Sequence, residues 1–319
     1  METSFFDSLI DNFGIWQHTD GETIIKAEGY ALDDAARGLL VCLALNKTDQ
    51  AEVLFDYVQK SQHQNRFYGF TTKKHRFIKF PASDDATGQV IWAMGYAYST
   101  NFHKTQAKKL LEQLIPTVMD FKFMRGYAYA LLGTIYIDQV VSKQIANKLM
   151  AHFKDTSSEW LWPEPSMTYG NGIIPYALLR YAKVTGDQKI GQFGLEVLEF
   201  VEKKCISNRL LAPIGNEGWL LKGSDQVPTF SQQPIDAAYM LWGWIAAWEY
   251  FQKDQYYLQA QRWLTWFEGN NVLEKSMYDK ETLECYDGID EKGINYHSGA
   301  ESNICLLLSL YMINNKKIV

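Results

Sequence analysis

Six short polar or glycine-containing stretches along the chain each lead into an apolar helical pattern, and four of them carry an acid within their first few residues. Carboxyl groups held in pairs can hydrolyse a glycosidic bond, because one protonates the leaving oxygen while the other activates water. A helical unit used six times can close into a ring, which gathers equivalent helix starts at one end. The six stretches are residues 31–37, 83–89, 124–128, 167–172, 232–238 and 298–303.

Doubled acids stand at two of these starts, as Asp33-Asp34 and as Asp84-Asp85. A single acid at a helix start is favoured by N-capping and by the helix dipole, whatever the function. The second acid of each pair is not needed for a cap, and it stands beside a like charge, which makes ionisation of both costly. We therefore interpret Asp34 and Asp85 as candidate catalytic groups, with Asp33 and Asp84 as neighbours that contact a substrate.

Two further acids stand at later helix starts. Asp236 is a single acid and fits a cap as well as a catalytic role. Glu301 lies in a mostly apolar stretch, where an acid is costly unless it is paired or used. We predict Asp85 as the general acid, Asp34 or Asp236 as the base, and Glu301 beside them.

Four long segments connect the predicted helix pairs and are rich in aromatic residues, glycine, proline and acids: residues 62–83, 154–169, 205–233 and 270–298. Long loops in a compact domain are usually functional, and sugars need flat aromatic faces and polar side chains. Such aromatics also serve as plugs of the core. The side chains predicted to contact a substrate, in these loops or at the helix starts, are Asp33, Arg37, Asp84, Glu164, Tyr169, Asn171, Trp219, Gln233, Asp287 and His297.

The apolar periodicity predicts five pairs of helices, each made of an apolar helix, a polar turn and a more amphipathic helix. A sixth apolar helix over 299–313 has no partner after it, so we assign the amphipathic residues 4–13 as its outer helix. The fold class is all-α, an (α/α)6 toroid formed by one domain over residues 1–319. The five predicted pairs are 33–45 with 49–61, 85–99 with 103–118, 125–138 with 141–153, 171–184 with 188–204, and 235–252 with 254–269.

Composition and charge exclude several classes of function. The net charge is −6 and the sequence shows no clustered basic face, which argues against a nucleic-acid partner. No signal peptide or membrane-spanning run is recognisable, so we predict a cytoplasmic protein without membrane association. The four separated cysteines indicate buried free thiols, and the six histidines lack the spacing of a metal site. Without a phosphate-binding loop either, we predict neither metal nor cofactor.

The helix starts resemble those of a family of bacterial six-hairpin, glycosidase-like proteins that occur alone or fused behind a glycosyltransferase domain. The resemblance rests on residues 30–37, 84–89, 164–172, 232–237 and 299–302, and it spans nearly the whole chain. It implies a toroid that acts on carbohydrate. This sequence departs from the family's pattern at Ala35, Gln89 and Gly170, where we expect Asn, Arg and Asp respectively.

We therefore predict a glycoside hydrolase, inverting in outcome, that acts on an oligosaccharide or glycan. Two alternatives from other classes stay open. A sugar 2-epimerase would use the same toroid with histidines as the proton-transfer groups, and His75 and His297 lie in the predicted site loops. A non-catalytic glycan-binding or accessory module beside a glycosyltransferase partner is the other alternative, since several polar groups of the family pattern are missing.

Overall fold

A computed structural model describes residues 1–21 and 23–319 of the chain. The described residues form two compact units. One unit contains residues 1–149, 297–304 and 319, and the other contains residues 150–296 and 305–318. The prediction of one domain over residues 1–319 stays a prediction.

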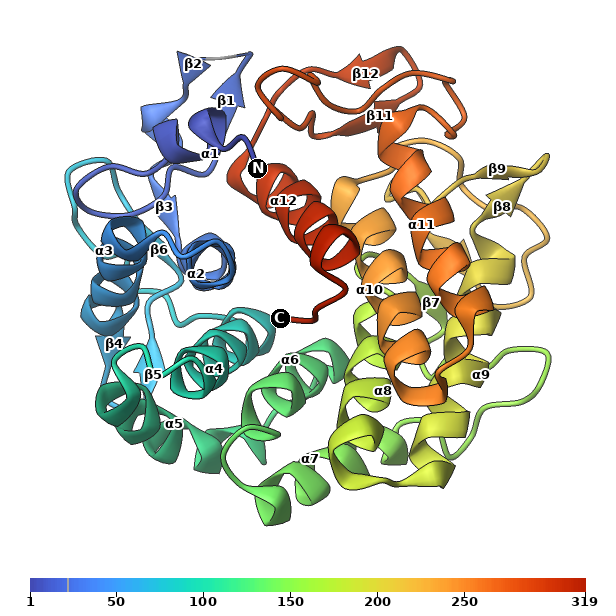
Figure 1. Ribbon diagram of the computed structural model, residues 1–319, viewed down its shortest axis with the longest axis horizontal. Helices are drawn as coiled ribbons and strands as arrows, with labels where there is room; N and C mark the ends of the chain where they lie inside the picture. The colour runs from blue at the N-terminus through green and yellow to red at the C-terminus, as the bar shows by residue number, and fades with distance from the viewer. Residues whose placement is uncertain (22) are drawn as a thin grey trace. The chain divides into compact units, whose positions relative to one another are not determined.

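The first unit begins with the helix pairs that the sequence predicts (Figure 1). The apolar helices α2 and α4 pack side by side, and each also packs against the amphipathic helix that follows it, α3 or α5. The helices are α1 (Ser4–Ser8), α2 (Leu32–Ala44), α3 (Thr48–Lys60), α4 (Asp84–Ser99), α5 (Lys104–Val118), α6 (Met124–Thr134) and α7 (Gln139–Ala151, which runs into the second unit).

Close packing of α4 against α6 depends on glycine. A Cβ atom added at Gly95 would lie 2.2 Å from the carbonyl oxygen of Gly133, so a side chain at this crossing would push the helices apart. Every residue of α6 is buried, as is most of α4. The two helices therefore have the all-round apolar character expected of inner helices.

The end of α6 differs from the prediction. We predicted a helix over 125–138, but α6 ends at Thr134. Asp138 accepts hydrogen bonds from the backbone N–H groups of Val140 and Val141 at 2.8 and 3.1 Å, which places it at the start of α7. A side chain that satisfies the first N–H groups of the next helix ends the preceding one earlier than its apolar pattern suggests.

The amino-terminal helix is also shorter than predicted. We predicted an outer helix over 4–13, whereas α1 ends at Ser8 and Ile10 forms a β-bridge with Ile15. Asp11 turns the chain, because its carboxylate accepts the N–H groups of Phe13 and Gly14. This local turn competes with the helix and overrides the amphipathic pattern.

The second unit contains α8 (Ile173–Thr185), α9 (Gln188–Lys204), α10 (Pro234–Phe251) and α11 (Asp254–Glu268). Here α8 and α10 pack together, and each pairs with the amphipathic helix that follows it. The predicted stop at residues 185–187 is confirmed. Gly186 adopts a left-handed conformation after α8, and Asp187 caps α9. The last helix, α12 (Ala300–Asn315), contributes its start to the first unit and its remainder to the second.

The segment before α2 and the long connections contain small antiparallel sheets of two strands each, which the sequence analysis did not predict. A short 3-10 helix, η1 (Lys26–Glu28), precedes β3. The strand pairs are β1 (Thr19–Asp20) with β2 (Thr23–Ile24), β3 (Tyr30–Ala31) with β6 (Phe70–Thr71), β4 (Gln62–His63) with β5 (Arg66–Phe67), β7 (Ser166–Met167) with β10 (Leu220–Leu221), β8 (Ile206–Ser207) with β9 (Leu210–Leu211), and β11 (Gly288–Asp290) with β12 (Gly293–Asn295).

Candidate active site at the helix starts

Four helix starts lie side by side in the first unit. The start of α2 is joined to the loop before α4, because Leu32 N–H donates to the carbonyl oxygen of Gly69. The start of α4 is joined to the segment before α6, because the carboxylate of Asp84 accepts the N–H groups of Lys122 and Phe123 at 2.7 and 3.3 Å. The start of α12 joins α2 through the side chain of Arg37, which lies in the second turn of α2.

Arg37 collects three carboxylates. Its guanidinium donates to Glu301 Oε2 at 2.7 Å and to Asp34 Oδ1 at 3.0 Å, and it lies 3.7 Å from Asp33 Oδ2. The spacing of Asp33 and Asp34 from Arg37 places all three on one face of α2. Glu301 comes from the first turn of α12. We call this set of four residues the Arg37 cluster.

Exposure divides the Arg37 cluster into a buried part and an open part. The Arg37 side chain is 1% exposed and that of Asp34 is 10% exposed, whereas those of Asp33 and Glu301 are each 38% exposed. Asp34 is thus the buried counterion of a buried guanidinium. Asp33 and Glu301 each have one side fixed by Arg37 and another that solvent or a ligand can reach.

None of the doubled acids is the N-cap residue of its helix. Ala31 precedes α2 and makes no side-chain cap, while Ser83 caps α4 by accepting the N–H of Ala86 at 3.1 Å. Asp84 has a different structural duty, since it holds the segment before α6. Asp85 is half-buried. Gln89, one turn further along α4, is buried.

Gln89 is a polar residue that the sequence analysis did not select for the site. Its side-chain oxygen is buried and has no hydrogen-bond partner among the described residues. Because residues four apart share a helix face, this oxygen lies on the same side of α4 as Asp85. The signal in the sequence was the departure from the expected Arg, which we read only as a loss.

In the second unit, Asp236 joins the starts of α8 and α10. Its Oδ1 accepts the N–H of Gly170 at 2.7 Å, and its side chain is buried. Gly170 has a φ of +58°, a left-handed conformation that glycine adopts without steric cost. The buried Asn171 supports the same turn by donating to the carbonyl oxygen of Thr168 at 2.9 Å.

Some aromatic side chains of the second unit are buried in its core, and others are exposed. Trp160 and Trp162 are buried, so they belong to the core. Tyr169, Trp219 and Tyr296 are exposed, and Tyr296 packs edge-on against Tyr286 at 5.0 Å. Exposed aromatic rings on loops are a surface on which sugar rings can stack.

The other residues of the second unit that we predicted to contact a substrate lie in different local settings. Gln233 accepts a hydrogen bond from Asn216 at 2.7 Å, which orients both amides. Asp287 lies at the base of the β11–β12 hairpin, where its N–H donates to Asn295. The backbone oxygen of Glu164 accepts the indole N–H of Trp160. Whether these residues share one cavity with those of the first unit stays a prediction.

His297 is held by the first unit's amino-terminal sheet. Its Nδ1 lies 2.6 Å from the carbonyl oxygen of Thr19, so Nδ1 is the protonated nitrogen and donates. In the neutral ring Nε2 is then a proton acceptor. His75 instead stacks on Phe13 at 3.9 Å between ring centroids, and its Nε2 lies 3.4 Å from the Tyr30 hydroxyl.

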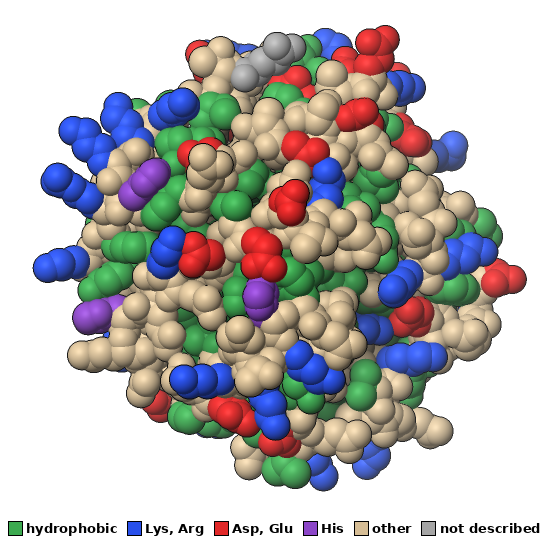
Figure 2. Space-filling view, turned by 60° about the vertical axis from the view of Figure 1, so that its left-hand side comes forward, with side chains coloured by type: hydrophobic (Ala, Val, Ile, Leu, Met, Phe, Trp, Pro, Cys, Tyr) green, Lys and Arg blue, Asp and Glu red, His purple; other side chains and the backbone are tan. Residues whose placement is uncertain are grey.

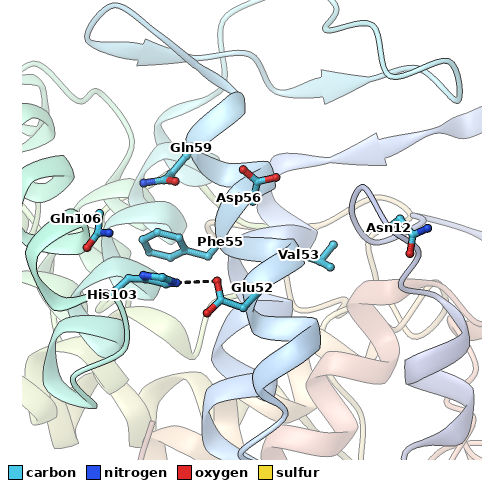
Figure 3. A pocket seen from close by; sticks show the side chains of 8 residues that line it. All are labelled: Asn12, Glu52, Val53, Phe55, Asp56, Gln59, His103 and Gln106. Atoms are coloured by element: carbon cyan, nitrogen blue, oxygen red, sulfur yellow. Dashed lines mark hydrogen bonds and ion pairs between the residues drawn. The ribbon is translucent and has the colours of Figure 1, made fainter.

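A separate cavity of about 360 Å³ opens beside α3 and the start of α5 (Figure 3). His103 Nε2 lies 2.7 Å from Glu52 Oε2 there, and Phe55 stacks on the histidine ring. None of the predicted site residues lines this cavity. Within residues 1–21 and 23–319, no three His, Cys, Asp or Glu residues are grouped so that they could hold a metal ion.

The same described residues contain no helix that is both long enough and apolar enough to cross a membrane. The four cysteines are buried free thiols, as the sequence predicted.

Comparison with known proteins identifies the fold. No protein-family model matches the chain, and no curated protein matches it in sequence. A sugar epimerase from a ruminal bacterium is 11% identical with a TM-score of 0.75, over 99% of this chain and 96% of that chain. Cellobiose 2-epimerase from Bacillus thermoamylovorans is 16% identical with a TM-score of 0.73, over 97% of this chain and 96% of that chain. The GH76 alpha-mannanase from Bacteroides thetaiotaomicron is 12% identical with a TM-score of 0.63, over 98% and 93%.

These likenesses span nearly the whole of each chain at low sequence identity, so they concern the fold. The fold class is the all-α (α/α)6 toroid, which confirms the prediction from the six helix starts.

Proposed function

We propose that the protein is a carbohydrate-active enzyme that hydrolyses a glycosidic bond in an oligosaccharide or glycan. The observation that carries the proposal is the Arg37 cluster, in which three carboxylates share one guanidinium. When its carboxyl groups are ionised, the cluster has an excess of negative charge. Glycoside hydrolysis passes through a transition state with positive charge on the sugar ring, which such a cluster stabilises.

Glu301 is the carboxylate of the Arg37 cluster best suited to activate water. Its Oε2 is fixed by Arg37 at 2.7 Å, while its Oε1 makes no hydrogen bond within the described part of the chain. Asp34 is mostly buried, and Asp236 is buried with one oxygen on Gly170. A base has to reach a water molecule beside the sugar, so we favour Glu301 over the more buried Asp34 and Asp236.

Asp85 is our proposed general acid. At its helix start Ser83 caps α4, and Asp84 holds the segment before α6. Asp85 is half-buried in the first turn of α4, beside these two residues. We propose an inverting reaction, in which water attacks from the face opposite the leaving oxygen.

The exposed aromatics of the second unit are the proposed sugar-stacking groups. Tyr169 and Trp219 present exposed rings, and Gln233 and Asn216 form an oriented amide pair. Aromatic rings can stack on the apolar C–H groups of a sugar, and amides can form hydrogen bonds with its hydroxyl groups. This supports a glycan substrate.

Turnover of a panel of labelled oligosaccharides tests the proposal. We expect new reducing ends from the unmodified protein, and turnover about 10²-fold lower from Asp85→Asn and Glu301→Gln, the usual scale for losing an acid or a base. Asp155→Asn and Glu112→Gln change highly exposed acids on outer segments and are matched controls. Equal activity in all four variants would exclude Asp85 and Glu301 from the mechanism. NMR that identifies the first-formed anomer of the product tests whether the reaction inverts.

A sugar 2-epimerase is the second candidate, and His297 favours it. The Thr19 carbonyl oxygen fixes the tautomer in which Nε2 can accept a proton, as abstraction at sugar C2 requires. Two of the similar folds reported above are named epimerases. In heavy water, an epimerase incorporates deuterium at C2 of the recovered sugar and releases no new reducing end. His297→Gln should then abolish the exchange.

An accessory role is supported by the departures at Ala35, Gln89 and Gly170. If the protein binds oligosaccharides and neither cleaves nor epimerises them, a cytoplasmic glycan-binding module beside a glycosyltransferase becomes the better proposal. Co-purification with a glycosyltransferase from cells that express tagged protein tests that partnership.

A further inference from the structure

The most basic segment of the chain is a hairpin in the first unit. Residues 66–80 contain five Lys or Arg residues and no Asp or Glu, although the whole chain has a net charge of −6. Figure 2, which brings this side of the molecule forward, shows basic side chains gathered along its left edge. This local cluster departs from the expectation that the sequence has no clustered basic face. The five basic residues are Arg66, Lys73, Lys74, Arg76 and Lys79.

Backbone hydrogen bonds give the hairpin a fixed shape. Ile78 N–H donates to the carbonyl oxygen of Phe70 at 2.9 Å, and Thr72 N–H donates to that of Arg76 at 3.0 Å. At its base, Ala82 N–H donates to the carbonyl oxygen of Phe67. The turn between Thr72 and Arg76 therefore stands at the tip, where three of the basic residues lie.

One side of the hairpin is packed inward. Phe67 is buried, Thr71 is buried and within 3.0 Å of the Tyr57 hydroxyl, and the Phe77 ring contacts those of Tyr57 and Tyr68. These contacts fix the face that turns away from the protein. Side chains that alternate with the packed ones along the two strands must point outward.

The outward side carries large apolar residues. Phe70 is 45% exposed, Ile78 is 47% exposed and Phe80 is 66% exposed. Phe70 and Ile78 are cross-strand neighbours, and Phe80 follows two residues later. Together with the basic tip they form what we call the basic hairpin face. Exposed apolar side chains grouped in this way mark an interaction surface.

We propose that the basic hairpin face docks the protein onto the surface of a membrane rich in anionic lipids. Lys and Arg are attracted to anionic headgroups, while Phe and Ile side chains enter the boundary between headgroups and acyl chains. Nucleic acids and acidic polysaccharides satisfy the charge but leave the aliphatic Ile78 without a counterpart. The segment also contains no Asn or Gln to read bases or sugar hydroxyls.

Docking through this face has a consequence for the candidate site. Gly69, at the base of the hairpin, accepts the N–H of Leu32 at the start of α2, one residue before Asp33. If the proposed hydrolase function holds, the Arg37 cluster therefore works close to a membrane surface, and a glycan carried on a lipid is the fitting substrate class. The docking itself does not depend on that function, so its test uses no substrate.

Sedimentation of the full chain with lipid vesicles tests the docking. We expect binding to phosphatidylglycerol vesicles, little binding to phosphatidylcholine vesicles, and loss of binding at high salt. The double variants Lys73→Ala/Lys74→Ala and Ile78→Ser/Phe80→Ser should each lower the partition coefficient by at least about tenfold, because one removes charge and the other removes insertion.

Two matched variants control for charge and exposure. Lys108→Ala/Lys109→Ala removes two exposed lysines of α5, and Leu258→Ser removes an apolar residue that is 62% exposed on α11. Both should bind vesicles like the unmodified protein. Absence of binding to phosphatidylglycerol, or equal losses in the control variants, overturns the proposal. Binding to RNA or an acidic polysaccharide that needs Lys73 and Lys74 but not Ile78 and Phe80 overturns it in favour of that polymer.

Discussion

The guanidinium of Arg37 fixes one oxygen of Glu301 at 2.7 Å and leaves the other oxygen without a hydrogen bond among the described residues. A carboxylate held in this way has a defined orientation and an accessible lone pair. Pre-orientation of this kind lowers the cost of reaching a reactive geometry, since little rotamer freedom remains to be lost on binding. The contact between Arg37 of α2 and Glu301 of α12 therefore orients the carboxylate that we propose as the base.

Replacing Arg37 by alanine should destabilise the protein by about 3–5 kcal/mol, the usual cost of leaving a buried charge without its partner. The buried Asp34 loses its counterion in this variant. Chemical denaturation followed by circular dichroism measures the loss. Arg209→Ala, at an exposed position, is the control and should change the free energy of unfolding by less than about 0.5 kcal/mol. A similar small change in Arg37→Ala contradicts the buried ion pair.

Asp34→Asn and Glu301→Gln should separate stability from turnover. Asp34 is the buried partner of Arg37, so its amide should lower the free energy of unfolding by about 1–3 kcal/mol, as expected when a buried charged hydrogen bond is lost. Glu301 is more exposed, so its amide should cost little stability and about 10²-fold in turnover. Melting temperatures and initial rates on one substrate distinguish the two. The reverse pattern would falsify the assignment of Glu301 as the base.

Glu202 should make the protein less stable as the pH rises. Burial raises the pKa of its carboxyl group, against smaller opposing effects of Trp263 and Arg262. A raised pKa in the folded state stabilises the protein below the unfolded pKa of about 4.3, and this contribution is lost as pH rises through the folded pKa. Glu202→Gln should therefore gain stability relative to the unmodified protein as the pH increases from 4 to 8.

Glu199→Gln on the same helix is the control for Glu202, because Glu199 is exposed. The measurement is the free energy of unfolding in urea at several pH values. A difference between Glu202→Gln and the unmodified protein that stays constant over this range contradicts the burial argument.

Deleting residues 1–13 should lower stability by several kcal/mol, at about 25 cal/mol per Å² of apolar surface uncovered. Phe6 and Leu9 are buried in the first unit, and Asp7 pairs with Lys47 at 2.7 Å. Deleting only the exposed Met1 and Glu2 is the control. If both truncations melt at the same temperature, the amino-terminal segment does not close the fold.

Much of the fold could be predicted from the sequence, because two independent signals mark most of the inner helices. These signals are a polar stretch at the helix start and an apolar pattern along the helix. The turn at Gly186 and Asp187 is an example, since both residues act through local backbone chemistry. The end of α6 and the shortness of α1 were missed, because the side chains of Asp138 and Asp11 redirect the chain by local hydrogen bonds. The strands, of two or three residues each, leave too little periodicity to detect.

The candidate site was less predictable, since its contacts join residues far apart in the sequence. Asp33, Asp34 and Arg37 lie within two helical turns, so their proximity follows from helical spacing. That Asp84 holds Lys122 and Phe123, or that Asp236 holds Gly170, depends on tertiary packing. Periodicity identifies the start of a helix but does not identify which neighbouring start its acid will contact.

The order of synthesis bears on the Arg37 cluster. Arg37 and Glu301 are 264 residues apart, so a ribosome makes the guanidinium long before its carboxylate partner. At about 5–20 residues per second, the nascent α2 carries Arg37 with only Asp33 and Asp34 for at least about 13 seconds. The cluster is therefore completed at a late stage of translation, and a nascent chain stalled before residue 301 holds the site in a form that lacks its proposed base.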